Sequence, residues 1–131
     1  MLLVTACGAT FDYNSLASKK ITGTRFPGHL ARAYQSFSLS EAHDMYDWID
    51  GAHFGRKVLA ALSQEHVLPE RVEDWWNRGE ALARLMQERL RLTSLLEPHV
   101  RRQSPKAAAM AQADLDCWAE QQEKNWQHDH I

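Results

Sequence analysis

Seven histidines make metal binding the first chemistry to consider in this chain, because imidazole nitrogens are frequent ligands of zinc and copper. His29, His43 and His53 fall in the first half of the sequence, and positions 128–130 read His-Asp-His. His43 and His53 are ten positions apart across an expected turn, and the ends of chains tend to fray. We therefore expect no functional metal site.

Catalytic motifs are absent from the sequence. It contains no glycine-rich phosphate loop, no His-Glu-x-x-His zinc motif, no Cys-x-x-Cys pair and no Gly-x-Ser-x-Gly elbow. Cys117 is the only cysteine beyond the first seven residues, and a lone cysteine on an apolar helix face is more often a small core residue than a nucleophile. We therefore expect no enzymatic activity, no catalytic residue and no bound cofactor.

The first seven residues end in a cysteine whose surroundings suggest covalent modification. Residues 4–7 read Val-Thr-Ala-Cys and resemble the bacterial lipobox, in which a branched residue and two small residues precede the modified cysteine. The resemblance implies that Cys7 becomes a diacylated N-terminus, and Gly8 in place of aspartate favours the outer membrane. Only six residues precede Cys7, whereas a signal peptide needs a basic start and about 7–15 apolar residues, so we expect translation to begin upstream of Met1. The alternative is an ordinary apolar N-terminus that carries a thiol.

The size and composition of the chain fit one folded domain. It has 131 residues, 44% of them hydrophobic and 24% charged, which is enough to bury a single core without disulfides or metals. The formal net charge of -2 provides no basic surface to collect phosphates, so we expect no nucleic-acid partner. No apolar run approaches the roughly 20 residues that a helix needs to cross a bilayer. The expected attachment to a membrane is therefore the lipid on Cys7.

Hydrophobic periodicity predicts an all-α fold. Apolar residues recur every three or four positions from Phe26 onward, and no stretch alternates long enough to predict a strand. The predicted class is a four-helix antiparallel bundle built on a tetratricopeptide-like helical hairpin, with an irregular N-terminal tether. The predicted domains are a truncated lipoprotein signal peptide (1–7), a flexible tether (8–25) and a single helical domain (26–131). Within that domain we predict a first helix from Phe26, a turn near 50–51, helices at about 52–64, 79–96 and 107–126, and a packed loop at 67–77.

The predicted hairpin at 31–62 resembles a single tetratricopeptide-type unit, in which a small residue lets two helices approach and an aromatic residue fills the gap. One unit is too few for a repeat solenoid, which needs about three. We place Arg56 and Lys57 on the outer face of the second helix. Trp75 and Trp76 anchor the loop that follows, and as an exposed pair they would form a partner surface.

The resemblance that covers most of the chain rests on residues 113–126, Ala-Asp-Leu-Asp-Cys-Trp-Ala-Glu-Gln-Gln-Glu-Lys-Asn-Trp, together with Val-Leu-Pro at 67–69 and the lipobox. In this order they resemble the N-terminal helical region of alphaproteobacterial OmpA-family lipoproteins. That family continues into a linker and a C-terminal OmpA-like domain that binds peptidoglycan. The chain stops at Ile131, before either, so peptidoglycan binding is expected only through the missing domain. The family also has a downstream cysteine, which implies a disulfide partner for Cys117 that is absent from this chain.

Two functions are compatible with these features. The first is a non-enzymatic cell-envelope lipoprotein module, anchored through Cys7 at the periplasmic face of the outer membrane, which acts as a structural or protein-interaction domain beside an unidentified envelope protein. The second is a cytosolic, tetratricopeptide-like helical adaptor that starts at Met1 and binds a peptide or protein partner in its hairpin groove. Lipidation of Cys7 distinguishes the two.

Overall fold

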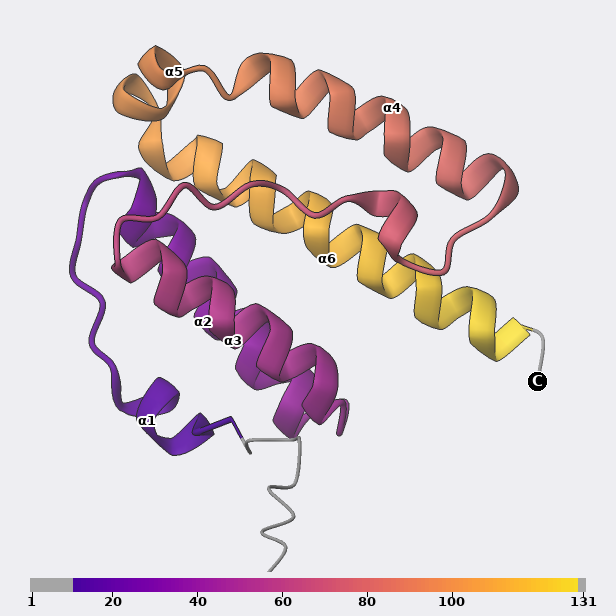
Figure 1. Cartoon of the computed structure of the whole chain (residues 1–131), viewed down its shortest axis with the longest axis horizontal. Helices are drawn as coiled ribbons and strands as arrows, with labels where there is room; N and C mark the ends of the chain where they lie inside the picture. Colours follow the sequence, from indigo (N-terminus) through magenta and orange to yellow (C-terminus); the bar gives the residue numbers. More distant parts are fainter. Residues whose placement is uncertain (1–10, 130–131) are drawn as a thin grey trace, which may run out of the picture.

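Helices are the only regular elements in the part of the chain that the structure describes. The computed structural model describes the backbone of residues 11–129 and the side chains of residues 11–124. The prediction of an all-α fold is confirmed (Figure 1). In order, the elements are α1 (Tyr13–Ser18), α2 (Phe26–His43), α3 (Trp48–Leu62), the 3₁₀ helix η1 (Val72–Asp74), α4 (Gly79–Leu95), α5 (Pro98–Gln103) and α6 (Pro105–Asp129).

The helices α2 and α3 form a hairpin whose turn lies earlier than the sequence suggested. Tyr46 adopts a φ of 55°, in the left-handed region, and this reverses the chain after α2. Asp47 then caps α3, because its Oδ1 atom accepts a hydrogen bond from the backbone N–H of Asp50 at 3.0 Å. The predicted turn near 50–51 is wrong because this cap places Asp50 and Gly51 inside the first turn of α3.

Two apolar clusters hold the helices together. The larger cluster lies between α2, α3 and the first half of α6, and the smaller one lies between η1, α4 and the middle of α6. The helix α6 therefore has the α2–α3 hairpin on one side and α4 on the other, and α4 runs antiparallel to it (Figure 1). The buried members are Leu16, Leu30, Ala31, Tyr34, Phe54, Val58, Ala61, Ala109 and Ala113 in the larger cluster, and Val72, Leu85, Leu115 and Ala119 in the smaller.

The segment predicted as a flexible tether is folded over its described part, residues 11–25. Asp12 caps α1 by accepting a hydrogen bond from the backbone N–H of Ser15 at 2.9 Å. Leu16 is buried in the larger apolar cluster, and Gln35 of α2 donates to its carbonyl oxygen at 2.9 Å. The prediction of a tether is wrong for these residues, because a helix of six residues is too short to show a repeating apolar face in the sequence.

Two prolines mark the starts of helices in the C-terminal half. The helix α4 ends before Pro98, as predicted, but Pro98 also begins the short helix α5, which the sequence did not reveal. Pro105 begins α6.

The side chain of Arg89 in α4 donates to the carbonyl oxygens of Glu70 at 2.7 Å and Pro69 at 3.2 Å. These bonds tie α4 to the irregular segment that connects it to the hairpin.

Candidate functional site

One face of α6 carries a polar side chain at every fourth residue, and this face turns inward toward the α2–α3 hairpin. The residues are Gln112, Asp116, Glu120 and Lys124, and we call them the polar stripe. The first three are buried, and the side chain of Lys124 is 16% exposed. Residues four apart lie on the same side of a helix, so the stripe is continuous. Buried polar groups need partners, and the hairpin supplies them in two networks.

The first network surrounds the carboxylate of Asp116. Its Oδ2 atom accepts hydrogen bonds from the hydroxyl of Tyr34 at 2.5 Å and from Nζ of Lys57 at 2.9 Å. Its Oδ1 atom accepts from the backbone N–H of Glu70 at 2.8 Å. Gln112, one turn earlier on the stripe, donates to the Tyr34 hydroxyl at 3.1 Å. Burial raises the pKa of Asp116 and of Tyr34, and the positive charge of Lys57 partly offsets this for Asp116.

Lys57 is the cation of this network, so its predicted place on the outer face of α3 is wrong. Its side chain is 12% exposed, and Nζ also bonds the carbonyl oxygen of Leu68 at 3.0 Å and lies 4.7 Å from the ring centre of Tyr34. Glu70 lies 3.7 Å from the same Nζ and is hydrogen-bonded to His53. Burial alone would raise the pKa of Glu70, but the bond to His53 and the charge of Lys57 outweigh it and lower that pKa. The network therefore fastens the hairpin, the following loop and α6 together.

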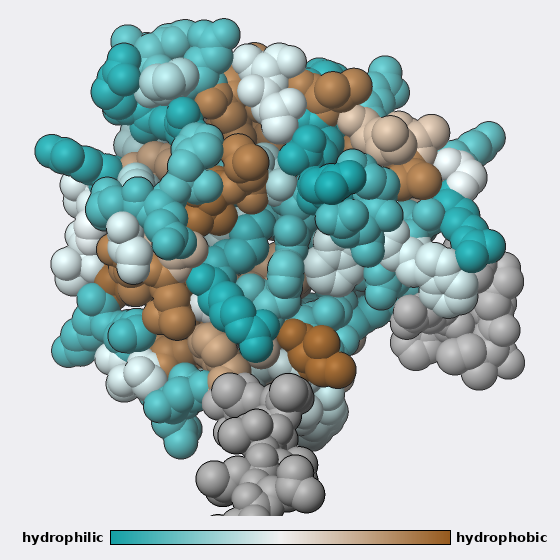
Figure 2. All heavy atoms as spheres, viewed as in Figure 1, coloured by the Kyte–Doolittle hydropathy of each residue, from teal (hydrophilic) through white to brown (hydrophobic). Residues whose placement is uncertain are grey.

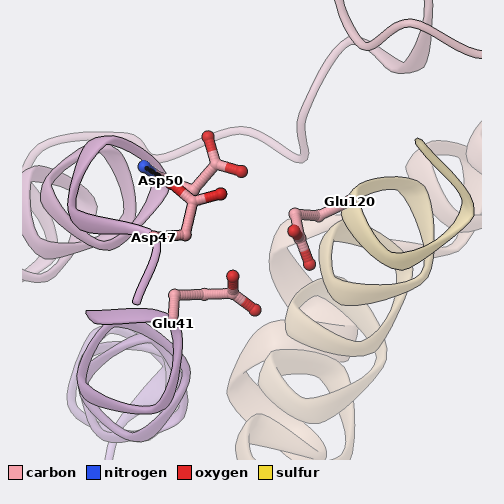
Figure 3. Close-up of side chains that lie close together, drawn as sticks. All are labelled: Glu41, Asp47, Asp50 and Glu120. Carbon is pink, nitrogen blue, oxygen red and sulfur yellow. Dashed lines mark hydrogen bonds between the residues drawn. The ribbon is translucent and has the colours of Figure 1, made fainter. Parts of the chain in front are cut away.

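The second network gathers four carboxylates around one ammonium group. Glu41 of α2, Asp47 and Asp50 at the start of α3, and Glu120 of α6 point toward one another, with one oxygen of each within 4.8 Å of the others (Figure 3). We call them the carboxylate cluster. Nζ of Lys124 lies 2.7 Å from Glu120 and 3.6 Å from Asp47, and it is also bonded to Glu41.

The charges of the carboxylate cluster do not cancel, and this imbalance shifts its pKa values. Burial, with the negative charge of Glu41, raises the pKa of Glu120 to about 7. Burial, with the charge of Asp47, raises the pKa of Asp50 to about 6. Burial alone would lower the pKa of Lys124, but its bonds to Glu120 and Glu41 raise it. Near neutral pH the ammonium of Lys124 is therefore charged, and the carboxylates of Glu120 and Asp50 take up protons as the pH falls.

Four carboxylate oxygens are also the donor set that hard cations such as Ca²⁺ and Mg²⁺ prefer. In this fold the ammonium of Lys124 contacts three of the four carboxylates and acts as their counter-ion. A divalent cation would have to displace that ammonium to reach them. The chemistry that the arrangement supports directly is therefore ion pairing and proton uptake.

The two tryptophans that the sequence predicted as a partner surface have different surroundings. Trp75 packs against both apolar clusters and stacks on the Phe54 ring, with centroids 5.8 Å apart and an interplanar angle of 10°. Trp76 is 49% exposed, and the guanidinium of Arg78 lies 5.0 Å from its ring centre. Trp75 therefore belongs to the core, and only Trp76 presents a large exposed surface.

The cysteines and histidines are not gathered into a site among the described side chains. Cys117 is half-buried on α6, and burial, followed by the negative charge of Glu120, raises the pKa of its thiol. His29 contacts Arg32 at 2.8 Å, whereas His53 is bonded within the first network. Cys7 and the side chains of 128–130 lie outside the described residues.

The turn between α2 and α3, together with the first two residues of α3, exposes four large apolar side chains within five positions. Met45, Tyr46, Trp48 and Ile49 are 49%, 77%, 49% and 83% exposed, and we call them the hairpin tip. Asp47, the charged residue among them, turns inward as part of the carboxylate cluster. Figure 2 shows apolar atoms at the lower end of the face in view, where the hairpin ends. The sequence did not reveal the tip or the polar networks, because apolar side chains are exposed in the tip and polar side chains are buried in the networks, the reverse of the usual arrangement.

The N-terminal segment packs beside the hairpin tip. The ring of Phe11 lies against Gly55 of α3, where a Cβ atom would overlap it. The hydroxyl of Tyr13 donates to the carbonyl oxygen of Trp48 at 2.5 Å, and the two rings meet edge to face with centroids 5.3 Å apart. A Cβ atom at Gly51 would come within 2.8 Å of the Tyr13 hydroxyl. The two glycines therefore make room for the aromatic residues of this segment.

Membrane-spanning helices and known relatives give no further guide to function. Within the described residues, no helix combines the length and apolarity needed to cross a membrane. Comparison with known protein families, curated proteins and solved structures finds no match to this chain. The resemblance to OmpA-family lipoproteins therefore stays a prediction from sequence motifs.

Proposed function

We propose that this chain is a non-enzymatic module of a cell-envelope lipoprotein, anchored to the membrane through a lipid on Cys7. The observation that carries the proposal is the Val-Thr-Ala-Cys motif at 4–7, which lies just ahead of a folded domain. Phe11 already packs against α3, and the four residue steps from Cys7 to Phe11 span at most about 14 Å. A lipid on Cys7 would therefore hold the domain close to the membrane surface.

The surroundings of the buried charged groups support a non-enzymatic role. Asp116 and Glu120 have no exposed surface, so a substrate does not reach their carboxylates. Asp116 accepts hydrogen bonds from three donors, and Glu120 is paired with Lys124. Groups engaged in this way stabilise the docking of α6 on the hairpin.

The protein-interaction surface that we propose lies on α4 and on the loop before it. Leu85 is the only residue of α4 that is buried, although the helix has 17 residues. Exposed apolar side chains that lie close together are typical of surfaces that bind another protein. Met86 and Leu90 are four positions apart and so lie on one side of α4, and Trp76 is exposed in the loop before it; an envelope protein would cover these three side chains.

The resemblance to OmpA-family lipoproteins supports a location at the periplasmic face of the outer membrane. The resembling segment 113–126 lies in α6, the helix that joins the two apolar clusters. In this proposal α6 leads toward a peptidoglycan-binding domain, and the chain reaches peptidoglycan only through that domain. Cys117, half-buried on α6, would pair with a downstream cysteine outside this chain.

The proposal is tested by metabolic labelling with a clickable palmitate in the native host, with the gene expressed in its own flanking DNA. We expect label on the wild-type protein and on a Cys117→Ser variant, but none on a Cys7→Ser variant. The Cys117→Ser variant is the matched control, because it also removes one thiol. Absence of label from all three forms would contradict the lipid anchor.

A second candidate function is a cytosolic adaptor, in which a tetratricopeptide-like hairpin within a four-helix antiparallel bundle binds a peptide. It is favoured by a surface pocket of about 610 Å³ at the start of α2 and beside α5. Apolar Phe26, Leu30 and Val67 line the pocket together with the cationic Arg25 and Arg101. Such a pocket suits a peptide with one apolar and one acidic side chain. An unlabelled Cys7, with peptide binding that an Arg101→Ala variant loses, would favour this function.

A further inference from the structure

The hairpin tip is an apolar surface that the fold covers only in part. Its four side chains come from positions 45–49, and each is about half exposed or more. Single exposed apolar side chains are ordinary on a protein surface, whereas a compact group of them marks a contact with another molecule or with a membrane.

Backbone hydrogen bonds hold the tip in place. The ring of Trp48 packs edge to face on the rings of Tyr13 and His43 and still leaves 49% of the residue exposed. The N–H of Met45 donates to the carbonyl oxygen of Ser40 at 3.1 Å, and the N–H of Asp47 donates to that of Glu41 at 2.7 Å. Between these bonds, Tyr46 adopts its left-handed φ of 55°, which is uncommon for an aromatic residue. The fold therefore presents the tip outward.

The position of the tip identifies what covers it. The first described residue, Phe11, packs on the same helix that begins at the tip, and Tyr13 contacts Trp48 directly. Cys7 lies at most about 14 Å of extended chain from Phe11. A lipid on Cys7 therefore brings the bilayer surface to this end of the hairpin.

We infer that the hairpin tip inserts shallowly into the headgroup and acyl boundary of the bilayer to which Cys7 is anchored. This inference rests on the proposed lipid anchor. Tryptophan and tyrosine are enriched at that boundary. Insertion of the isoleucine and methionine side chains removes further apolar surface from water. Asp44, exposed at the end of α2, limits the depth of insertion and gives anionic lipids no advantage. A surface of this size binds weakly by itself, and the anchor makes it effective by raising its local concentration.

The test supplies the tether chemically, so that it does not depend on lipidation in the cell. A full-length Cys117→Ser chain, whose only thiol is Cys7, is coupled to a maleimide-bearing phosphatidylethanolamine in phosphatidylcholine vesicles. Quenching of tryptophan fluorescence by brominated phosphatidylcholine is then measured. We expect quenching in this chain, loss of that quenching on Trp48→Phe, and retention of it on Trp76→Phe. Trp76 is the matched control, because it is as exposed as Trp48 but lies outside the tip.

A second pair of variants tests the tip without changing a tryptophan. Ile49→Ser should reduce quenching of Trp48, whereas Leu90→Ser, at an exposed position on α4, should not. Equal quenching in the Trp48→Phe and parent chains would overturn the inference, even if palmitate labels Cys7 in the host. Dimerisation of the vesicle-free chain that Ile49→Ser abolishes would also overturn it, because a second copy would then cover the tip.

Discussion

Lys57 of α3 and Asp116 of α6 form a salt bridge, with Nζ 2.9 Å from Oδ2, at an interface that carries two buried networks of charged groups. The Lys57 side chain is 12% exposed and that of Asp116 has no exposure. Asp116 is stabilised by Lys57 and by its hydrogen bonds, and Lys57 is stabilised by Asp116 and, at 3.7 Å, by Glu70, so removal of one charge leaves the other buried with less compensation.

Replacing Asp116 with asparagine should therefore destabilise the protein severely. The amide keeps the shape of the carboxylate but leaves Glu70, 3.7 Å away, as the remaining carboxylate beside Lys57, so we expect the free energy of unfolding to fall by about 3 kcal/mol, the lower end of the range for a broken buried pair. Urea denaturation followed by circular dichroism measures this value. The control is Asp114→Asn, an exposed position on the same helix, which should change stability by less than about 0.5 kcal/mol. Equal, small effects of the two changes would show that the salt bridge does not stabilise the fold.

Glu120 should make the stability of the fold depend on pH. Its pKa is raised from 4.5 to about 7, chiefly by burial. The folded state therefore holds the proton of Glu120 more tightly than the unfolded state does. The protonated carboxyl stabilises the fold below pH 4.5, and this stabilisation is lost as the pH rises through about 7. We expect the free energy of unfolding to fall by about 1–3 kcal/mol over this range in denaturation curves recorded at several pH values.

Glu120→Gln should flatten this dependence on pH, because glutamine does not titrate. Asp50, whose pKa is raised to about 6, contributes a slope of the same sign that remains in the variant. Glu65→Gln, at an exposed position, serves as the control and should keep the wild-type slope. If Glu120→Gln and wild type lose stability in parallel between pH 4.5 and pH 7, the cluster does not take up the proton on this side chain.

The long helices could be predicted from the sequence because their apolar faces repeat over several turns. The helix α6 was predicted at 107–126 and runs over Pro105–Asp129, and α4 was predicted at 79–96 and runs over Gly79–Leu95. The helices α1 and α5 have six residues each, too few for a repeating face, and they were missed.

The polar networks could not be predicted from hydropathy, although one signal for them was present. Gln112, Asp116, Glu120 and Lys124 repeat every four residues, which places them on one side of a helix. A polar face of this kind is usually solvated, and only the fold shows that the hairpin covers it. The ionic partners come from positions far away in sequence, such as Lys57, so no local pattern reveals them.

Gly55→Ala should detach the N-terminal segment from α3. The added methyl group would overlap the ring of Phe11, and we expect a loss of about 1–3 kcal/mol in the free energy of unfolding or faster hydrogen exchange in α1. In a Phe11→Ala background the same change should cost far less, because the ring that it strikes is gone. If Gly55→Ala costs the same in both backgrounds, the effect does not arise from contact with Phe11.

Cys117 should react slowly with thiol reagents at neutral pH. Its thiol is half-buried, and its pKa is raised by burial and then by the negative charges of Glu120 and Glu41, so little thiolate forms. In a Cys7→Ser chain we expect Ellman's reagent at pH 7 to react at least about tenfold more slowly with the folded protein than with the urea-unfolded one. Comparable rates in the two states would indicate an accessible, activated thiol and would reopen a catalytic role for Cys117.

Trp75 and Trp76 should differ in what their removal does, although they are adjacent in sequence. Trp75→Ala removes a ring that contacts both apolar clusters and stacks on Phe54, so we expect a loss of about 2–4 kcal/mol in the free energy of unfolding. Trp76→Ala removes a half-exposed ring that stacks with Arg78, and it should cost less than about 1 kcal/mol. Urea denaturation of the two variants makes the comparison. Equal losses would mean that Trp76 is also part of the core, and the surface proposed for an envelope partner would then reduce to the exposed side chains of α4. Because the Trp76→Ala chain should stay folded, it allows loss of partner binding to be measured separately from loss of the fold.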